Sequence, residues 1–94
     1  MVRAADSAEA SVEVKNRLGL HLRAASTLAQ AAAQFSSQIT ITRGKNQASA
    51  KSVTGLMMLG AGQGVKLKVR AEGSDAHEAL KAVETLFADG FNEE

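Results

Sequence analysis

Alternation of apolar and polar residues predicts strands in four places along the chain. In each of them apolar side chains fall at every second position, which is the spacing of a strand with one buried face. The four runs are residues 11–15, 38–42, 47–51 and 65–70. Residues 43–46 carry turn-forming side chains, so the second and third runs are predicted to form a hairpin. Because each strand has only one apolar face, helices should cover the sheet on one side only.

Two amphipathic helices and one short apolar helix are predicted between and after these strands. The first helix spans residues 24–36, where apolar residues recur three and four positions apart, and the second is the apolar stretch 53–59. Ser52 is expected to cap the second helix. Asp75 is expected to cap the third, and Glu78 three residues later completes the pattern of a capping box.

The predicted order of elements is β-α-β-β-α-β-α, which indicates an α+β fold with an antiparallel-rich sheet. Ninety-four residues, 45% of them hydrophobic, suffice for one core and are too few for two. Residues 1–10 carry small and charged side chains without a period and are predicted to be a flexible leader. The domain is predicted to span residues 11–90, and residues 91–94 are assigned to a C-terminal tail.

Composition excludes several classes of function. The net charge is +1 and three Phe are the only aromatic residues, so a nucleic-acid partner is not expected. Cys is absent and the two His lie far apart in the sequence, so no disulfide, catalytic thiol or metal site is predicted. The glycines fit neither a dinucleotide fingerprint nor a P-loop, so no cofactor is predicted. No apolar run approaches the roughly 20 residues that cross a bilayer, and residues 1–10 lack a signal-peptide core, so a cytoplasmic protein without membrane insertion is expected.

His21 is the main candidate for chemistry. It and His77 are the only side chains of types that titrate near neutral pH without special tuning. His21 lies just before the first helix, whose free N–H groups favour an anion, and Arg23 adds a cation that suits phosphate oxygens. An imidazole placed there can accept a phosphoryl group, but position alone leaves open whether His21 is only a cap or loop residue. His77 has no nearby cation and is expected to be a surface residue.

Two features in the middle of the chain allow two interpretations each. Ser52 is explained by its role as a cap, although a phosphate added there would also meet a helix N-terminus. The residues Leu56, Met57, Met58 and Leu59 are too apolar for one buried face. They belong either to the core or to an exposed patch that docks partners.

Two segments resemble the family of HPr, the histidine-containing phosphocarrier protein of the phosphoenolpyruvate-dependent phosphotransferase system. Residues 19–25 read Gly-Leu-His-Leu-Arg-Ala-Ala, similar to the family's Gly-Leu-His-Ala-Arg-Pro-Ala. Residues 50–60 read Ala-Lys-Ser-Val-Thr-Gly-Leu-Met-Met-Leu-Gly, similar to its Lys-Ser-x-x-Gly-x-Met-x-Leu-Gly. The resemblance extends over about residues 11–90.

The resemblance implies an open-faced sandwich, in which three helices cover one side of a four-stranded antiparallel sheet. It implies that His21 takes a phosphoryl group on Nδ1 from enzyme I and passes it to an A-type domain of an enzyme II or to a regulatory acceptor, with Arg23 positioning the group. The sugar and nitrogen-related branches both stay open. Ser52 would match the serine that HPr kinase/phosphorylase modifies in some members, and residues 56–59 would dock partners. Such a chain is a carrier rather than a stand-alone enzyme, and it is expected to be a monomer.

Two residues depart from the family pattern. Ala24 stands where Pro is usual, and Leu22 where a small residue is common. Because Ala24 lacks the fixed φ of Pro at a helix start, a looser site and a different choice of partners are expected. An alternative from another class is a regulatory binding module of ferredoxin-like order without phosphohistidine, which the placement of His21 beside Arg23 disfavours.

Overall fold

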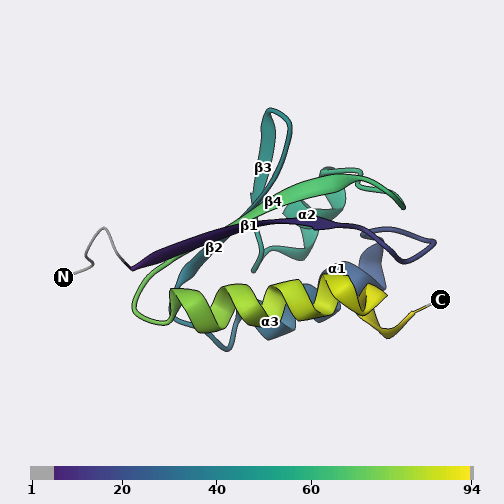
Figure 1. The fold of residues 1–94 in the computed structure, drawn as a ribbon. Coiled ribbons are helices and arrows are strands. Elements are labelled where there is room, and N and C mark those ends of the chain that lie inside the picture. Colours follow the sequence, from purple (N-terminus) through teal and green to yellow (C-terminus); the bar gives the residue numbers. More distant parts are fainter. Residues whose placement is uncertain (1–5, 94) are drawn as a thin grey trace.

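The computed structural model describes residues 6–93, which form a four-stranded antiparallel sheet with helices on one face (Figure 1). In chain order the elements are β1 (Ser7–Glu13), α1 (Leu22–Ala32), β2 (Gln38–Arg43), β3 (Asn46–Ser49), α2 (Val53–Met58), β4 (Lys66–Glu72), α3 (Ala76–Ala88) and the 3-10 turn η1 (Gly90–Asn92). This is the predicted order β-α-β-β-α-β-α with one short turn added. The α+β class and the open-faced sandwich are confirmed.

β4 lies in the interior of the sheet, although it is the last strand in the chain. The strand order is β1-β4-β2-β3, so β4 pairs with both β1 and β2. Buried and exposed residues alternate along β4 over its whole length, as the sequence predicts for a sheet with one covered face. The hairpin of β2 and β3 projects beyond the rest of the sheet (Figure 1).

β1 starts at Ser7, so the predicted leader of residues 1–10 is wrong over residues 7–10. The strand signal is weak there because Ala8 and Ala10 have little preference for strands. These residues join the sheet because β4 offers them a partner along its full length, from Lys66 to Glu72. Pairing with it satisfies those of their backbone N–H and C=O groups that face β4. The rest of the predicted leader, residues 1–5, lies outside the described residues.

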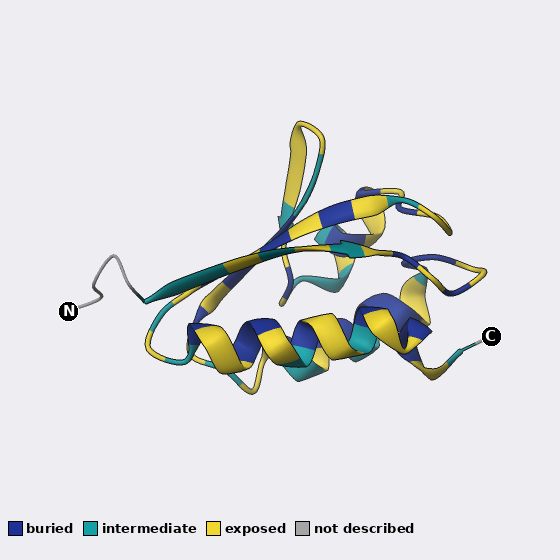
Figure 2. Cartoon of the chain, viewed as in Figure 1, coloured by how far each residue is buried: buried dark blue, intermediate teal, exposed yellow. Residues whose placement is uncertain are grey.

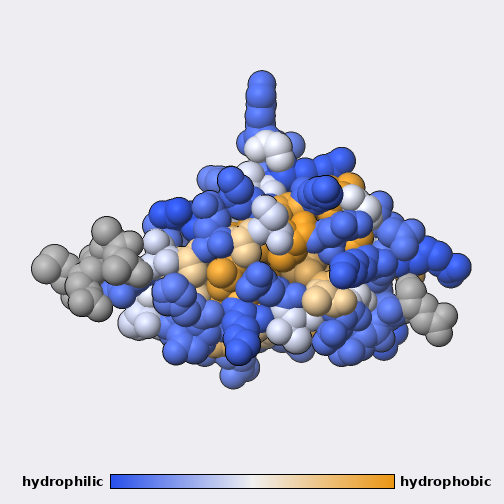
Figure 3. Space-filling view, in the orientation of Figure 1, coloured by the Kyte–Doolittle hydropathy of each residue, from blue (hydrophilic) through white to orange (hydrophobic). Residues whose placement is uncertain are grey.

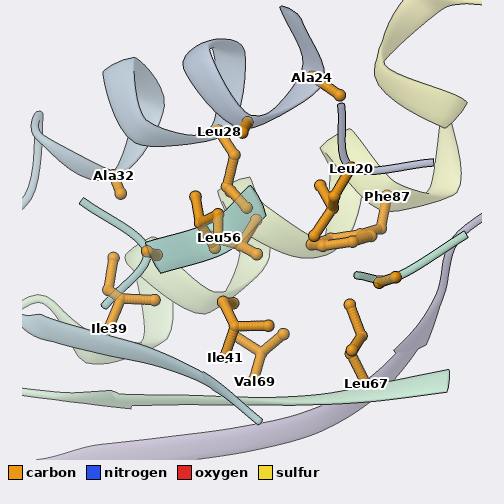
Figure 4. Packing of buried hydrophobic residues seen from close by; sticks show 14 of the residues in the cluster. Leu20, Ala24, Leu28, Ala32, Ile39, Ile41, Leu56, Leu67, Val69 and Phe87 are labelled. Carbon is orange, nitrogen blue, oxygen red and sulfur yellow. The ribbon is translucent and has the colours of Figure 1, made fainter. Parts of the chain in front are cut away.

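α1 and α3 lie side by side across the covered face of the sheet, and the core fills the space between the layers (Figure 1). Figure 2 shows the buried stripe of α3 turned toward the sheet and its exposed stripe turned away. In Figure 4, Leu28 of α1 and Leu56 of α2 point toward Ile41 and Val69 of the sheet, and all four side chains are fully buried. The apolar residues that recur three and four positions apart in the helices therefore pack in one core with those that alternate along the strands.

The face of the molecule in Figure 3 is mostly hydrophilic. Its apolar surface gathers between the sheet and α3. Within residues 6–93, no helix combines the length and the apolar character that a membrane span needs.

Asp75 precedes α3, but its side chain does not cap that helix, so the predicted capping box with Glu78 is wrong. The carboxylate instead accepts hydrogen bonds from the N–H groups of Ser36 and Ser37, both at 2.9 Å, and from the hydroxyl of Ser37. These donors lie in the loop after α1, which ends at Ala32 and is shorter than predicted. The hydrogen bond from the Ser37 hydroxyl contributes most to holding the pKa of Asp75 below its ordinary value.

The fold continues past the predicted domain boundary at residue 90. Residues 90–92 all have φ between 57° and 59°, which makes a left-handed turn after α3. Phe91 is buried in this turn and packs edge-on against Phe87, with the ring centroids 4.9 Å apart. Burial of the ring offsets the strain of a non-glycine residue at positive φ. Residues 91–93 of the segment assigned to a tail therefore belong to the domain and bring Glu93 back to the start of α1, while residue 94 lies outside the described residues.

Candidate functional site

The loop between β1 and α1 holds His21 at the helix start. His21 is the N-cap residue of α1, as its place in the sequence predicts. Leu20 just before it is buried, and its N–H donates to the carbonyl of Ala61 at 2.9 Å. Gly19 allows this close approach, because a Cβ there would lie 2.5 Å from the Ala61 oxygen and its φ is +72°. The backbone of His21 is thus fixed against a second loop.

The two ring nitrogens of His21 have different partners. Nδ1 accepts a hydrogen bond from the backbone N–H of Arg23 at 3.2 Å. Nε2 lies 2.9 and 3.0 Å from the two carboxylate oxygens of Glu93. Because an N–H donor faces Nδ1 and an acceptor faces Nε2, the proton belongs on Nε2 and the lone pair on Nδ1. That lone pair points at the N-terminal turn of α1.

Glu93 is the site residue that sequence reasoning missed. The hydrogen bond from His21 is the main cause that holds the pKa of Glu93 below its ordinary value, and a hydrogen bond from Asn16 adds to it. The carboxylate is therefore ionised at neutral pH. The apolar Phe91 beyond the last predicted helix was the available signal, since a buried residue there requires the chain end to fold back.

Asn16 connects the loop before His21 to the C-terminal turn. Its side chain is buried, and its Nδ2 donates to the carbonyl of Gly19 at 2.8 Å and to Glu93 Oε1 at 2.9 Å. A Cβ on Gly90 would lie 3.6 Å from the backbone nitrogen of Asn16, so the turn packs directly against this residue. Asn16 therefore orients the carboxylate that orients His21.

A hollow of about 460 Å³ opens beside the ring of His21. It is lined by two arginines, by parts of α1 and by the C-terminal turn: Arg17, Leu18, His21, Arg23, Thr27, Phe91, Asn92 and Glu93. Within residues 6–93, no group of three or more His, Asp and Glu side chains is placed to hold a metal ion. Cationic side chains and free N–H groups suit an anion here.

Met57 of α2 reaches the other side of His21. It lines a second hollow, of about 250 Å³, together with Leu18, Leu20 and residues 60–62. Ser52 caps α2 as predicted, and its Oγ accepts a hydrogen bond from the N–H of Gly55 at 3.0 Å. α2 therefore places an apolar side chain beside the histidine.

The predicted docking patch of residues 56–59 is wrong in half of its members. Leu56 is fully buried and Leu59 is 5% exposed, because both belong to the hydrophobic core, whereas Met57 and Met58 are 42% and 82% exposed. Two large apolar side chains that sequence reasoning left out are exposed as well, Leu18 at 66% and Leu22 at 61%. These four exposed residues, Leu18, Leu22, Met57 and Met58, are called the apolar rim below.

His77 lies apart from the site. It is exposed in the first turn of α3, where it was expected as a surface residue. Within the described part of the chain its side chain makes no hydrogen bond or ion pair. The two histidines therefore differ in their surroundings as well as in their sequence context.

Comparison with known proteins agrees with this geometry. Residues 8–89 match a protein family whose description is "PTS HPr component phosphorylation site". The chain belongs to the HPr family. HPr-family proteins are phosphocarriers of the phosphotransferase system, and this membership sets aside the ferredoxin-like module.

This HPr-family chain is similar both to relatives named HPr and to a relative named NPr. It is 41% identical to the phosphocarrier protein HPr of Xylella fastidiosa, over 92% of this chain and 97% of that one. It is 45% identical to the phosphocarrier protein NPr of Shewanella violacea, over 90% and 93% of the two chains. Among solved structures, HPr-C-His from Thermoanaerobacter tengcongensis superposes with a TM-score of 0.89 at 44% identity, over 93% and 98% of the chains.

Proposed function

We propose that His21 accepts a phosphoryl group on Nδ1 from enzyme I and passes it to an A-type domain of an enzyme II. The observation that carries this proposal is the direction of the Nδ1 lone pair. It faces the first turn of α1, where the N–H of Arg23 already donates to it, while Glu93 holds the proton on Nε2. An unprotonated nitrogen aimed at an anion-favouring helix end is what a phosphoryl acceptor needs.

The transfer step exchanges one bond to phosphorus for another. The Nδ1 lone pair forms the new N–P bond while the bond between phosphorus and the donor breaks, and the donor atom keeps that electron pair. The ring of His21 then carries a positive charge, because Nε2 keeps its hydrogen. The ionised carboxylate of Glu93, 2.9 Å away, stabilises this charge.

The oxygens of the arriving group meet positive charge from α1. The turn that begins at Leu22 offers backbone N–H groups without helical partners, and Arg23 adds a guanidinium that lines the same hollow. Phosphoryl transfer depends mainly on such positioning and charge stabilisation. The His21 side chain is 28% exposed, so successive partners can reach the bound group.

The apolar rim is the proposed docking surface. Leu18 and Met57 line a hollow that touches His21 itself, and Leu22 follows His21 in the chain. An apolar margin beside a polar centre resembles the arrangement of a protein interface. Unbranched Met side chains adapt to more than one partner, which suits a carrier that meets a donor and an acceptor in turn.

The acceptor branch and the regulation belong to the same proposal. Similarity to relatives named HPr and NPr supports either the sugar or the nitrogen-related branch. We infer a monomer that works in the cytoplasm, in line with the lack of Cys. We also infer that an HPr kinase/phosphorylase can modify Ser52, a half-buried residue at the start of α2.

Labelling with enzyme I and radioactive phosphoenolpyruvate tests the proposal. The wild-type chain and His77→Ala should take up an acid-labile label, and His21→Ala should take up none. Arg23→Ala should be labelled more slowly with its fold intact, because the guanidinium no longer positions the group. A label that persists in His21→Ala would refute the proposed acceptor.

A further inference from the structure

The hollow beside His21 contains a second arginine that lies outside the HPr-like motif. Arg17 precedes His21 by four residues, in the loop between β1 and α1, whereas the matching motif covers residues 19–25. Its side chain lines the same hollow as Arg23 and the ring of His21. Within residues 6–93, neither guanidinium forms an ion pair or hydrogen bond with another side chain. Both arginines are therefore available to a bound anion.

The charges around the hollow indicate what Arg17 contributes. Glu93 also lines the hollow, and its negative charge offsets that of Arg23. A phosphoryl group brings between one and two negative charges at neutral pH. Before transfer, with Arg23 alone, the side chains that line the hollow would have no net charge, because the ring of His21 becomes positive only when the N–P bond forms. Arg17 makes the surroundings of the group positive.

We propose that Arg17 is a second phosphate-positioning cation, which contacts the oxygens of the phosphoryl group on His21 from the loop while Arg23 contacts them from α1. This inference rests on the proposed function of His21. Two guanidinium groups from different segments restrict the orientation of the group more than one does, because each offers a planar set of donors. Arg17 thereby assists a site in which Ala24 replaces the more rigid Pro of the family.

Phosphoramidate is a suitable probe, because it donates a phosphoryl group without a protein partner. Nδ1 of His21 forms the new N–P bond, the N–P bond of phosphoramidate breaks, and the amine leaves as ammonia after taking a proton from solvent. Labelling of Arg17→Gln at low ionic strength should be about three- to tenfold slower than that of the wild type. Arg17→Lys should fall between the two, because it retains the charge but lacks the planar set of donors.

A charge-matched control excludes a general effect of net charge. Lys68→Gln removes one positive charge from the open face of the sheet, since Leu67 and Val69 on either side of Lys68 are buried under the helices. Its labelling rate should equal that of the wild type. The deficit of Arg17→Gln should shrink in high salt, because ions screen exposed charges.

Relocating the charge separates an electrostatic role of Arg17 from a structural one. Thr27 lies on α1 and lines the same hollow, so Thr27→Lys brings a new cation to it. The double variant Arg17→Gln, Thr27→Lys should recover at least half of the lost rate. Equal rates for Arg17→Gln and wild type, or a deficit that neither salt nor the relocated lysine changes, would overturn the role of Arg17.

The two proposals can fail separately. If phosphoramidate labels His21 and enzyme I does not, the proposed donor is wrong while the role of Arg17 is still measured. If enzyme I labels His21 and the Arg17 variants react normally with phosphoramidate, only the inference on Arg17 is wrong. A wild-type chain that phosphoramidate does not label at His21 contradicts the inference as well.

Discussion

Both carboxylate oxygens of Glu93 lie within 3.0 Å of Nε2 of His21, although 72 positions separate the two residues in the chain. The contact gives the two ring nitrogens opposite roles, with the proton on Nε2 and the lone pair on Nδ1. It depends on the left-handed turn of residues 90–92 and on the amide of Asn16. The turn after α3 is therefore part of the site.

Glu93→Gln tests whether the carboxylate assists transfer. The glutamine can still accept the Nε2 hydrogen, but it no longer neutralises the positive ring that forms during the reaction. We expect phosphoryl transfer from enzyme I to slow by about three- to tenfold, with an unchanged circular dichroism spectrum. Glu84→Gln, an exposed change on α3, is the matched control. Equal rates for both variants would exclude a role for the Glu93 charge.

Asn16→Ala tests how much the hydrogen bonds of the Asn16 amide stabilise the folded protein. The change removes both hydrogen bonds of the buried amide, to the carbonyl of Gly19 and to Glu93. We expect the free energy of unfolding to fall by about 1–3 kcal/mol, measured by urea denaturation. The exposed Asn46→Ala should change it by less than about 0.5 kcal/mol. A similar small effect at both positions would show that the Asn16 amide contributes little.

Protonation of the Asp75 carboxyl should lower the stability of the folded protein in acid. The folded protein holds the pKa of this carboxyl below its ordinary value of 3.8, with the hydroxyl of Ser37 as the main cause. The stabilisation is therefore fully present above pH 3.8 and is lost as the pH falls through the lower pKa of the folded state. Urea midpoints from pH 6 to pH 2 should fall less steeply for Asp75→Asn than for the wild type. Parallel curves would contradict this contribution.

Alanine substitutions at Met58 and Leu56 distinguish a side chain that docks partners from one that packs in the core. Met58→Ala should leave stability within about 0.5 kcal/mol of the wild type and raise the KM for enzyme I, because this side chain is 82% exposed in the apolar rim. Leu56→Ala should cost about 2–5 kcal/mol, because its fully buried side chain fills the centre of the core. Kinetics with enzyme I and thermal unfolding measure the two effects. A normal KM for Met58→Ala would remove this residue from the docking surface.

Two substitutions of Ser52 distinguish its role as a helix cap from a role in regulation. Ser52→Ala removes the acceptor for the Gly55 N–H and should cost about 0.5–2 kcal/mol of stability. Ser52→Asp keeps an acceptor at the cap, so stability should be preserved, but its negative charge beside α2 should slow labelling by enzyme I. Labelling of Ser52→Asp at the wild-type rate would count against regulation through this position.

Local sequence was sufficient to predict the order of the elements and the position of His21. Periods of two and of three to four residues reflect which face of a strand or helix meets the core, and these periods are visible over a few residues. The place of His21 just before α1 was likewise predicted, because helix starts have local signals, although α1 begins at Leu22 and the helix was predicted from residue 24. The cap formed by Ser52 was predicted for the same reason.

Tertiary structure decided the features that depend on distant parts of the chain. The Asp75 carboxylate accepts hydrogen bonds from groups after α1 instead of capping its own helix. Residues 7–10 form a strand beside β4, and Leu56 is buried in the core whereas Met58 is exposed. The partners of these residues are brought close only by the packing of the layers. The same reason applies to Glu93: the sequence by itself determined which histidine begins the helix, and only the folded C-terminal turn determined which of its nitrogens keeps the lone pair.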